Sequence, residues 1–210
     1  VAACAKHFPG HGHVDQDSHH VLPVCPLSEE ALATHLLPFR AAVEAGVASV
    51  MTAHVVYPAV DPDAPATLSR RWVQGVLRGE LGFDGPVFTD DLEMGAIVAH
   101  GGIGAAAVRA VWAGVDGLLV CARQDRVREV ADALAAESLR DPAFAQRCAE
   151  SLERLERLSQ AWPPRPVDVE QLPAHLGVHE DVAARVRESA AGSGSPALDP
   201  TEAHPGPRLG

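Results

Sequence analysis

The chain has 210 residues, 47% of them hydrophobic, so it can bury a sizeable core and is no small fold held by disulfides. A formal charge of −11 repels phosphates, which argues against nucleic acid and anionic membrane surfaces as partners. The four cysteines lack CxxC spacing, and no apolar run approaches the roughly 20 residues that span a bilayer, which predicts a cytoplasmic protein with reduced thiols.

Four short apolar runs, each followed by a helical pattern, predict an α/β fold with a parallel sheet covered by helices. The first predicted strand covers residues 1–5, and because it opens without a cap or turn, the sequence is expected to begin inside a domain. A histidine-rich loop follows, and then a helix over about residues 28–44 that Ser28 can cap. Pro38 should start a second helical segment or kink this helix.

The second apolar run covers residues 48–53 and is followed by His54 and a proline-rich loop. Ser69 then offers an N-cap for a helix that extends to about Glu80. Four apolar residues of this helix have the spacing of one buried face: Trp72, Val73, Val76 and Leu77.

The third run, residues 85–91, predicts a buried strand that ends in two carboxylates, and the fourth strand is expected over residues 116–122. Such strands fit a small doubly wound sheet or half of an eight-stranded barrel. In both folds chemistry gathers at the carboxyl edge of the sheet. Polar residues that follow the predicted strands should therefore share one pocket: Lys6, His7, His54, Asp90 and Asp91.

Three further helices are predicted over residues 103–113, 125–138 and 142–160, and the last of them is amphipathic. Proline, glycine, serine and histidine accumulate after this helix. Residues 162–210 are therefore predicted to form a mobile tail.

Three kinds of chemistry fit the polar residues. The first is glycoside hydrolysis, in which Asp90 or Asp91 could be the nucleophile and a His–Asp pair from the loop could move the proton. The spacing of Asp17 and His19 lets the carboxylate fix the tautomer of the imidazole.

The second kind is a metal site, because ligand types alternate along the loop at His11, His13, Asp15 and Asp17. The glycines at positions 10 and 12 weaken this interpretation, since a flexible segment does not hold both rings on one side.

The third interpretation is structural: His11, His13 and His20 could simply hydrogen-bond to the backbone of the loop. One carboxylate of the Asp90–Asp91 pair could likewise cap a turn. For Glu93 and Met94, packing or surface exposure is the expected role, and Met94 could also line an apolar patch beside a ligand.

Three segments resemble glycoside hydrolase family 3, and within it the bacterial β-N-acetylhexosaminidases that act on peptidoglycan fragments. They are KHFPGHGHVDQDSHHVLP (residues 6–23), SVMTAHVVYPAVDPDAPATLS (residues 49–69) and GFDGPVFTDDLEMGAI (residues 82–97), in the family's order and approximate spacing. The resemblance implies that Asp90 is the nucleophile, His19 the general acid/base and Asp17 its orienting partner. It also implies that Lys6 and His7 bind hydroxyl groups of the sugar, and that no metal or other cofactor is needed.

The family's barrel has eight strands, and these segments correspond to the fifth to eighth. The resemblance therefore implies that residues 1–161 are the C-terminal half of a (β/α)8 barrel with its closing helix. The other half is expected in the same or another chain. The implied substrate is a small carbohydrate, GlcNAc-anhydro-N-acetylmuramic acid with or without its peptide, cleaved with retention in cytoplasmic cell-wall recycling.

Three alternatives remain. A family 3 β-glucosidase is disfavoured, because that branch generally takes its acid/base from another domain and lacks the Asp-x-His of the loop. The second alternative is a metal-dependent hydrolase that uses His11, His13 and Asp90. The third is a sugar-binding remnant without catalysis.

Overall fold

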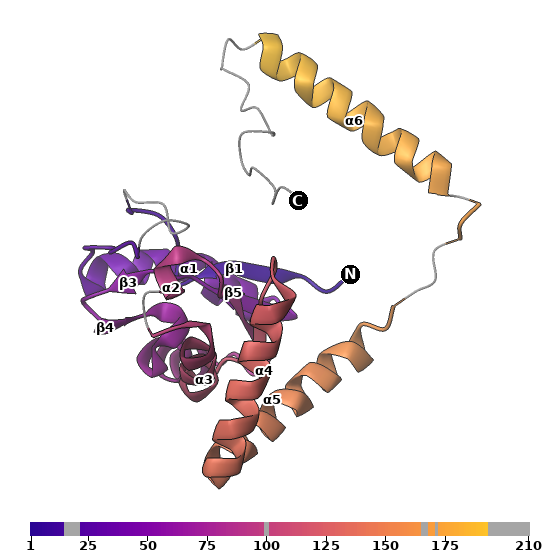
Figure 1. Ribbon diagram of the computed structural model, residues 1–210. Helices are drawn as coiled ribbons and strands as arrows, with labels where there is room; N and C mark the ends of the chain where they lie inside the picture. Colours follow the sequence, from indigo (N-terminus) through magenta and orange to yellow (C-terminus); the bar gives the residue numbers. More distant parts are fainter. Residues whose placement is uncertain (15–21, 99–100, 165–167, 171, 193–210) are drawn as a thin grey trace, which may run out of the picture. The chain divides into compact units, whose positions relative to one another are not determined.

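The computed structural model describes residues 1–14, 22–98, 101–164, 168–170 and 172–192. The chain divides into two units, Val1–Pro163 and Pro164–Gly210, which are described separately. The first unit contains a parallel sheet of four strands: β1 (Cys4–Phe8), β2 (Ser49–Thr52), β5 (Val87–Asp91) and β6 (Gly117–Leu119). Their order in the sheet is β1-β2-β5-β6, so each strand of this sheet lies beside the next one in sequence. Figure 1 labels β1 and β5 of this sheet together with helices of the same unit. This arrangement confirms the predicted α/β fold with a parallel sheet.

Helices follow each strand of this sheet: α1 (Glu29–Glu44), η2 (Arg71–Glu80), the short α2 (Gly95–Val98), α3 (Ile103–Ala113), α4 (Gln124–Arg140) and α5 (Pro142–Ala161). The hydroxyl of Ser28 accepts a hydrogen bond from the Ala31 amide at 3.3 Å, which confirms the predicted cap of α1. Of the two alternatives predicted for Pro38, a second helical segment is wrong, because α1 runs through Pro38 as one helix. Pro38 and Thr34, whose carbonyl the proline leaves unbonded, both face solvent, where water can replace the lost hydrogen bond.

The first strand lies further along the chain than predicted. It covers Cys4–Phe8 rather than residues 1–5, so Lys6 and His7 belong to the strand instead of following it. The strand continues past its apolar start because the neighbouring strand β2 and the residue after it, Ala53, continue beside it. The Ala53 amide donates to the Phe8 carbonyl at 2.7 Å, and Phe8 is fully buried.

The segment between β2 and η2 has more structure than the predicted proline-rich loop. It contains an antiparallel pair, β3 (Val56–Tyr57) and β4 (Asp61–Pro65), and a 3-10 turn, η1 (Ala66–Leu68). The helix η2 follows with π-type hydrogen bonding. Its predicted apolar face is confirmed, because Trp72, Val73, Val76 and Leu77 are all buried.

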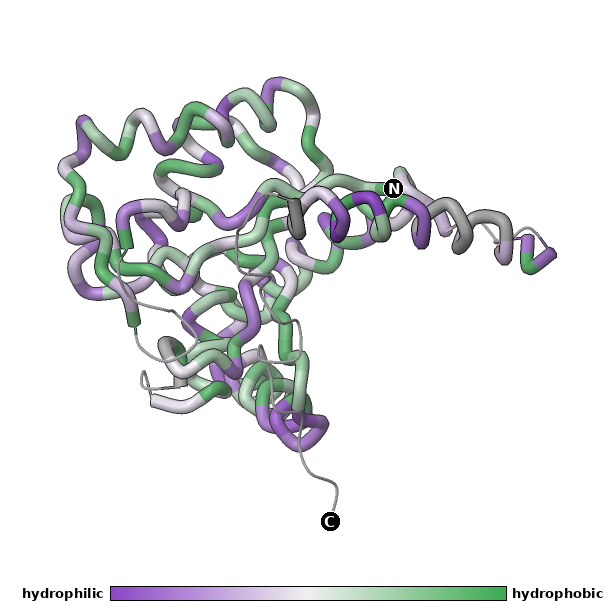
Figure 2. Tube along the Cα trace, turned by 90° about the horizontal axis from the view of Figure 1, so that it is seen from above, coloured by the Kyte–Doolittle hydropathy of each residue, from purple (hydrophilic) through white to green (hydrophobic). Residues whose placement is uncertain are grey.

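The core lies between the sheet and the helices that cover it. The ring of Phe8 packs edge-on against Phe39 of α1 and Trp72 of η2, with centroid distances of 5.2 and 5.8 Å. Polar and apolar residues alternate along the helical parts of the tube in Figure 2, as expected for helices with one buried face.

The second unit contains a helix, α6 (Leu172–Gly192), that the sequence analysis did not predict. The glycine- and proline-rich residues 193–210 of the predicted tail lie outside the described residues. In the part of the chain that the structure describes, no helix combines the length and apolar character needed to cross a bilayer.

Candidate active site

Four of the five polar residues expected at the carboxyl edge of the sheet lie close together there: His7, His54, Asp90 and Asp91. His7 of β1 and Asp90 of β5 approach across the intervening strand, with 3.6 Å between His7 Nε2 and Asp90 Oδ2. His54, just after β2, contacts the carbonyl of Asp91 at 3.0 Å. Lys6 is exposed next to His7. The site therefore draws on β1, β2 and β5.

The other two predicted catalytic residues, Asp17 and His19, fall within residues 15–21, outside the described residues. Their roles therefore remain predictions.

The carboxylate of Asp90 has one oxygen fixed and one oxygen open. Its Oδ1 accepts a hydrogen bond from the Asp91 amide at 2.8 Å, which sets the plane of the carboxylate. Its Oδ2 faces His7 at 3.6 Å, too far for a strong hydrogen bond. The side chain is 27% exposed. An oriented, accessible carboxylate oxygen is what a nucleophile needs.

His7 lies in an environment that favours its neutral form. Burial lowers the pKa of His7, and the nearby Lys6 and His11 lower it further, whereas Asp90 raises it. A neutral imidazole has one N–H donor and one acceptor nitrogen, so His7 can both give and receive a hydrogen bond near neutral pH.

Asp91 and Glu93 hold the turn after β5 against the end of β6. Oδ1 of Asp91 accepts from the Glu93 amide at 3.1 Å and from the Cys121 amide at 3.3 Å. The Glu93 carboxylate accepts from the Ala122 amide at 2.6 Å. The expectation that one carboxylate of the pair caps the turn is confirmed for Asp91. Met94 is buried.

His54 and Thr67 form a buried pair beneath this turn. The ring of His54 is 1% exposed, and its Nδ1 lies 2.7 Å from the hydroxyl of Thr67. The position of His54 after an apolar run pointed to the site. No sequence signal distinguished Thr67, because the two positions are 13 residues apart along the chain and are separated by a hairpin that only the fold reveals.

The described part of the histidine-rich loop shows no metal site. The His11 ring lies 6.2 Å from that of His7, whereas the His13 ring lies 5.1 Å from that of His35 on α1, so the two rings face different neighbours. Among the described residues no group of three or more metal-ligating side chains could hold an ion. The set of His11, His13 and Asp90 considered for zinc does not assemble. Asp15 and Asp17 lie outside the described residues.

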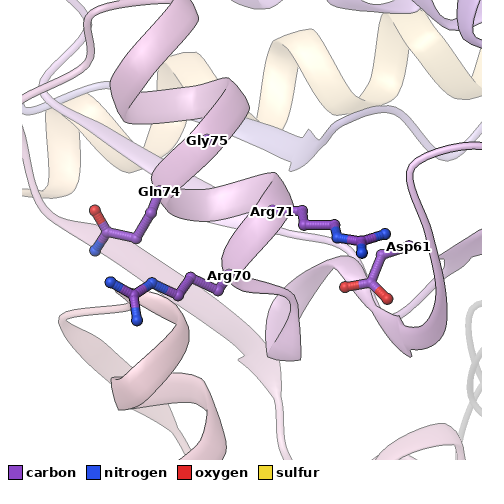
Figure 3. Close-up of a pocket in the computed structure, with 5 residues that line it drawn as sticks. All are labelled: Asp61, Arg70, Arg71, Gln74 and Gly75. Atoms are coloured by element: carbon purple, nitrogen blue, oxygen red, sulfur yellow. The ribbon is translucent and has the colours of Figure 1, made fainter.

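A separate pocket lies at the start of η2, lined by Asp61, Arg70, Arg71, Gln74 and Gly75 (Figure 3). The guanidinium of Arg71 lies toward Asp61 and donates to the Val60 carbonyl at 2.9 Å. Asp61 accepts a hydrogen bond from Ser69 at 2.5 Å. Arg71 and Asp61 are therefore engaged with the backbone and the helix start, and none of the lining residues belongs to the site around Asp90.

Stability should fall on acidification because of His54. Burial lowers the pKa of His54, although the Asp91 carbonyl and the carboxylates of Asp90 and Asp91 oppose the shift. Below about pH 6.5 the unfolded chain binds a proton that the folded chain does not, so the free energy of unfolding should drop by up to about 1.4 kcal/mol per pH unit, until the folded-state pKa is reached. Above about pH 6.5 the free energy of unfolding should no longer depend on the protonation of His54. Urea unfolding from pH 5 to 8 measures this, and His54→Gln should reduce the slope; an unchanged slope contradicts the assignment.

Comparison with known proteins identifies the family. The model of the Glycosyl hydrolase family 3 N terminal domain matches residues 1–158. A Beta-hexosaminidase of Thiobacillus denitrificans is 50% identical over 131 residues, which cover 62% of this chain and 36% of the relative. This chain spans about two fifths of the length of the curated relatives it matches.

Two solved structures are also similar. One is a glycoside hydrolase family 3 β-N-acetylglucosaminidase from Paenibacillus sp. str. FPU-7, at 48% identity and a TM-score of 0.75, covering 80% of this chain and 33% of that one. The other is zinc-bound CbsA from Thermotoga neapolitana, at 36% identity and a TM-score of 0.71, covering 77% of this chain and 36% of that one. Because the family model covers most of its length, the chain belongs to glycosyl hydrolase family 3.

Proposed function

We propose that this chain is part of a retaining β-N-acetylhexosaminidase that removes terminal β-linked N-acetylglucosamine. The observation that carries the proposal is the Asp90 carboxylate, held by the Asp91 amide through one oxygen and open at the other, at the carboxyl edge of a parallel sheet. The relatives named as a β-hexosaminidase and a β-N-acetylglucosaminidase support the choice of sugar.

In the proposed mechanism, Oδ2 of Asp90 attacks the anomeric carbon, forming a glycosyl ester as the bond to the leaving oxygen breaks. His19 gives its proton to that oxygen and then takes one from the water that hydrolyses the ester. Asp17 holds the ring of His19 in the required tautomer. Two displacements at one carbon return the β configuration.

Lys6 and His7 are proposed to bind hydroxyl groups of the sugar bound beside Asp90. An ammonium donates three hydrogen bonds, and a neutral imidazole both donates and accepts, which matches the hydroxyl groups of a pyranose. The lowered pKa of His7 supports this role, because protonation would remove its acceptor nitrogen.

The finer substrate proposal is GlcNAc-anhydro-N-acetylmuramic acid, with or without its peptide, in cytoplasmic cell-wall recycling. This proposal depends on the resemblance of KHFPGHGHVDQDSHHVLP to the peptidoglycan-acting branch. The same loop disfavours a β-glucosidase, since it supplies the acid/base within the barrel.

The chain is further proposed to supply the last four βα units of an eight-stranded barrel. Both β1 and β6 stand at edges of the described sheet, and unpaired edges are unfavourable in an isolated domain. This chain covers only 33% of the Paenibacillus structure, which supports the proposal that the remaining βα units of the barrel lie outside it. The partner half, in the same or another chain, would complete the sugar pocket.

A chromogenic GlcNAc β-glycoside tests the proposal. Proton NMR monitors which anomer of the sugar is released first. We expect the β anomer, and initial release of the α anomer would contradict a covalent intermediate. If a purified, folded protein that contains this chain together with the proposed partner half leaves the substrate intact, a sugar-binding remnant is favoured instead.

A metal-dependent hydrolase stays as the second candidate because the similar CbsA structure is described as zinc-bound. Rates should be unchanged after dialysis against EDTA. Loss of turnover that zinc restores would favour the metal-dependent alternative.

A further inference from the structure

A buried histidine outside the proposed acid/base pair contacts the backbone of Asp91, the residue after the proposed nucleophile. His54 is 1% exposed, and both ring nitrogens have partners. Nδ1 lies 2.7 Å from the Thr67 hydroxyl, and Nε2 lies 3.0 Å from the Asp91 carbonyl oxygen. Burying an imidazole in this way is unfavourable unless each contact is a real hydrogen bond.

The neighbouring donors and acceptors select one neutral tautomer. The Asp91 carbonyl can only accept, so Nε2 must carry the proton. Nδ1 must then accept from the Thr67 hydroxyl, which in turn can accept from the Thr52 hydroxyl at 2.9 Å. The Thr67 hydroxyl also lies 3.0 Å from the Ala53 carbonyl, but its single proton can serve only one acceptor. The Ala53 carbonyl accepts from the Thr67 amide at 3.3 Å as well, whereas the unprotonated Nδ1 has the Thr67 hydroxyl as its donor. Both ring nitrogens of His54, the Thr67 hydroxyl and the Asp91 carbonyl then each have a hydrogen-bond partner.

The opposite tautomer is unfavourable. With the proton on Nδ1, the lone pair of Nε2 would face the Asp91 carbonyl oxygen at 3.0 Å, and two acceptors would repel each other. A doubly protonated ring would satisfy both contacts, but it would place a charge in a buried site. Asp90 and Asp91 of β5 and His7 of β1 are the titratable groups that face His54, and burial outweighs the two carboxylates.

Through one residue, His54 reaches the proposed nucleophile. The carbonyl of Asp91 accepts from His54, while the amide of the same residue donates to Oδ1 of Asp90 at 2.8 Å. Fixing Asp91 therefore fixes the donor that sets the plane of the Asp90 carboxylate. We propose that His54, as the neutral Nε2–H tautomer, is a positioning residue that orients Asp90 through the backbone of Asp91. This role depends on the proposed glycosidase function, whereas the tautomer does not.

The tautomer is measured by a two-bond proton–nitrogen correlation spectrum of the ¹⁵N-labelled protein at neutral pH. The His54 signals are assigned by their loss in His54→Gln. A protonated Nε2 and an unprotonated Nδ1 are expected. A protonated Nδ1 would overturn the proposal, whether or not the protein hydrolyses any sugar. Thr67→Val, which keeps the shape and removes the donor to Nδ1, should weaken the preference for this tautomer.

Steady-state kinetics tests the positioning role in the active protein. His54→Leu should lower kcat by about 10- to 100-fold with KM changed less than about threefold, because the orientation of the nucleophile is lost rather than a contact with the sugar. His54→Gln should recover most of the rate, since its amide can donate to Asp91 and accept from Thr67. An unchanged kcat in folded His54→Leu would overturn the role.

The outcomes separate this proposal from the proposed function. An inactive wild-type protein with the expected tautomer would contradict the glycosidase function and the positioning role together, and leave the hydrogen-bond assignment standing. An active wild type whose rate is unaffected by His54→Leu contradicts the positioning role alone. If His54→Leu does not fold, His54→Met, which also lacks a donor to the Asp91 carbonyl, takes its place, and a kcat equal to that of the wild type would overturn the role.

Discussion

Asp90→Asn is expected to lower kcat for a GlcNAc glycoside by about 10⁴-fold, comparable to removal of the nucleophile in other covalent enzymes. The amide is a poor nucleophile, yet its oxygen can still accept the hydrogen bond from the Asp91 amide that Oδ1 accepts now. The side chain should therefore keep its place while the covalent step is lost. Initial rates, with folding checked by circular dichroism, measure the effect.

Asp91→Asn is the matched control, because it removes the neighbouring carboxylate and retains an oxygen that can accept from the amides of Glu93 and Cys121. This variant should keep its rate within about tenfold of the wild type. If Asp91→Asn is the inactive variant and Asp90→Asn turns over normally, the assignment within the pair is wrong.

Asp116→Asn is expected to reduce the free energy of unfolding by about 3–5 kcal/mol, the usual effect of breaking a buried ion pair. Asp116 precedes β6, and its side chain is 0% exposed. It binds the guanidinium of Arg78 at 2.7 Å, and it also pairs with Arg147 and Arg154 of α5. Burial lowers the pKa of Arg78, and the carboxylate of Asp116 opposes this shift. With a neutral amide at position 116, the three guanidinium groups would face one another without a negative charge between them.

Urea unfolding followed by tryptophan fluorescence measures this loss. The control is Asp125→Asn, which breaks an exposed ion pair with Arg123 and should leave the unfolding midpoint unchanged. A midpoint for Asp116→Asn equal to that of the wild type would show that the three arginines do not depend on this carboxylate. Activity is a poor readout here, since the cluster lies at the amino end of β6, away from the carboxyl edge.

Local signals predicted the parts of the fold that depend on local chemistry. The Ser28 cap and the apolar face of η2 were correct because capping and helical periodicity act over a few residues. The first strand was misplaced because hydrophobicity marks burial rather than pairing, and Lys6 and His7 continue the strand as polar residues. Helix α6 was missed because the composition of residues 193–210 dominated the interpretation of the whole tail.

The candidate site was only partly predictable for the same reason. Asp90 lies at the end of an apolar strand, which is a local signal, and the structure places it beside His7, across the intervening strand β2. The pairing of His54 with Thr67 and the assembly around Asp116 depend on elements far apart in sequence. Sequence periodicity carries no information about which distant groups meet.

The most direct test of the central claim is to identify the residue that carries the sugar. The protein that contains this chain, with His19→Ala to slow hydrolysis of the ester, is mixed with a GlcNAc glycoside whose leaving group needs no acid assistance. It is then quenched in acid and analysed by peptide mass spectrometry. We predict one N-acetylhexosaminyl group on the peptide that contains Asp90, attached at that carboxylate. A sugar attached to any other residue, or turnover with inversion and no attached sugar, would contradict the account.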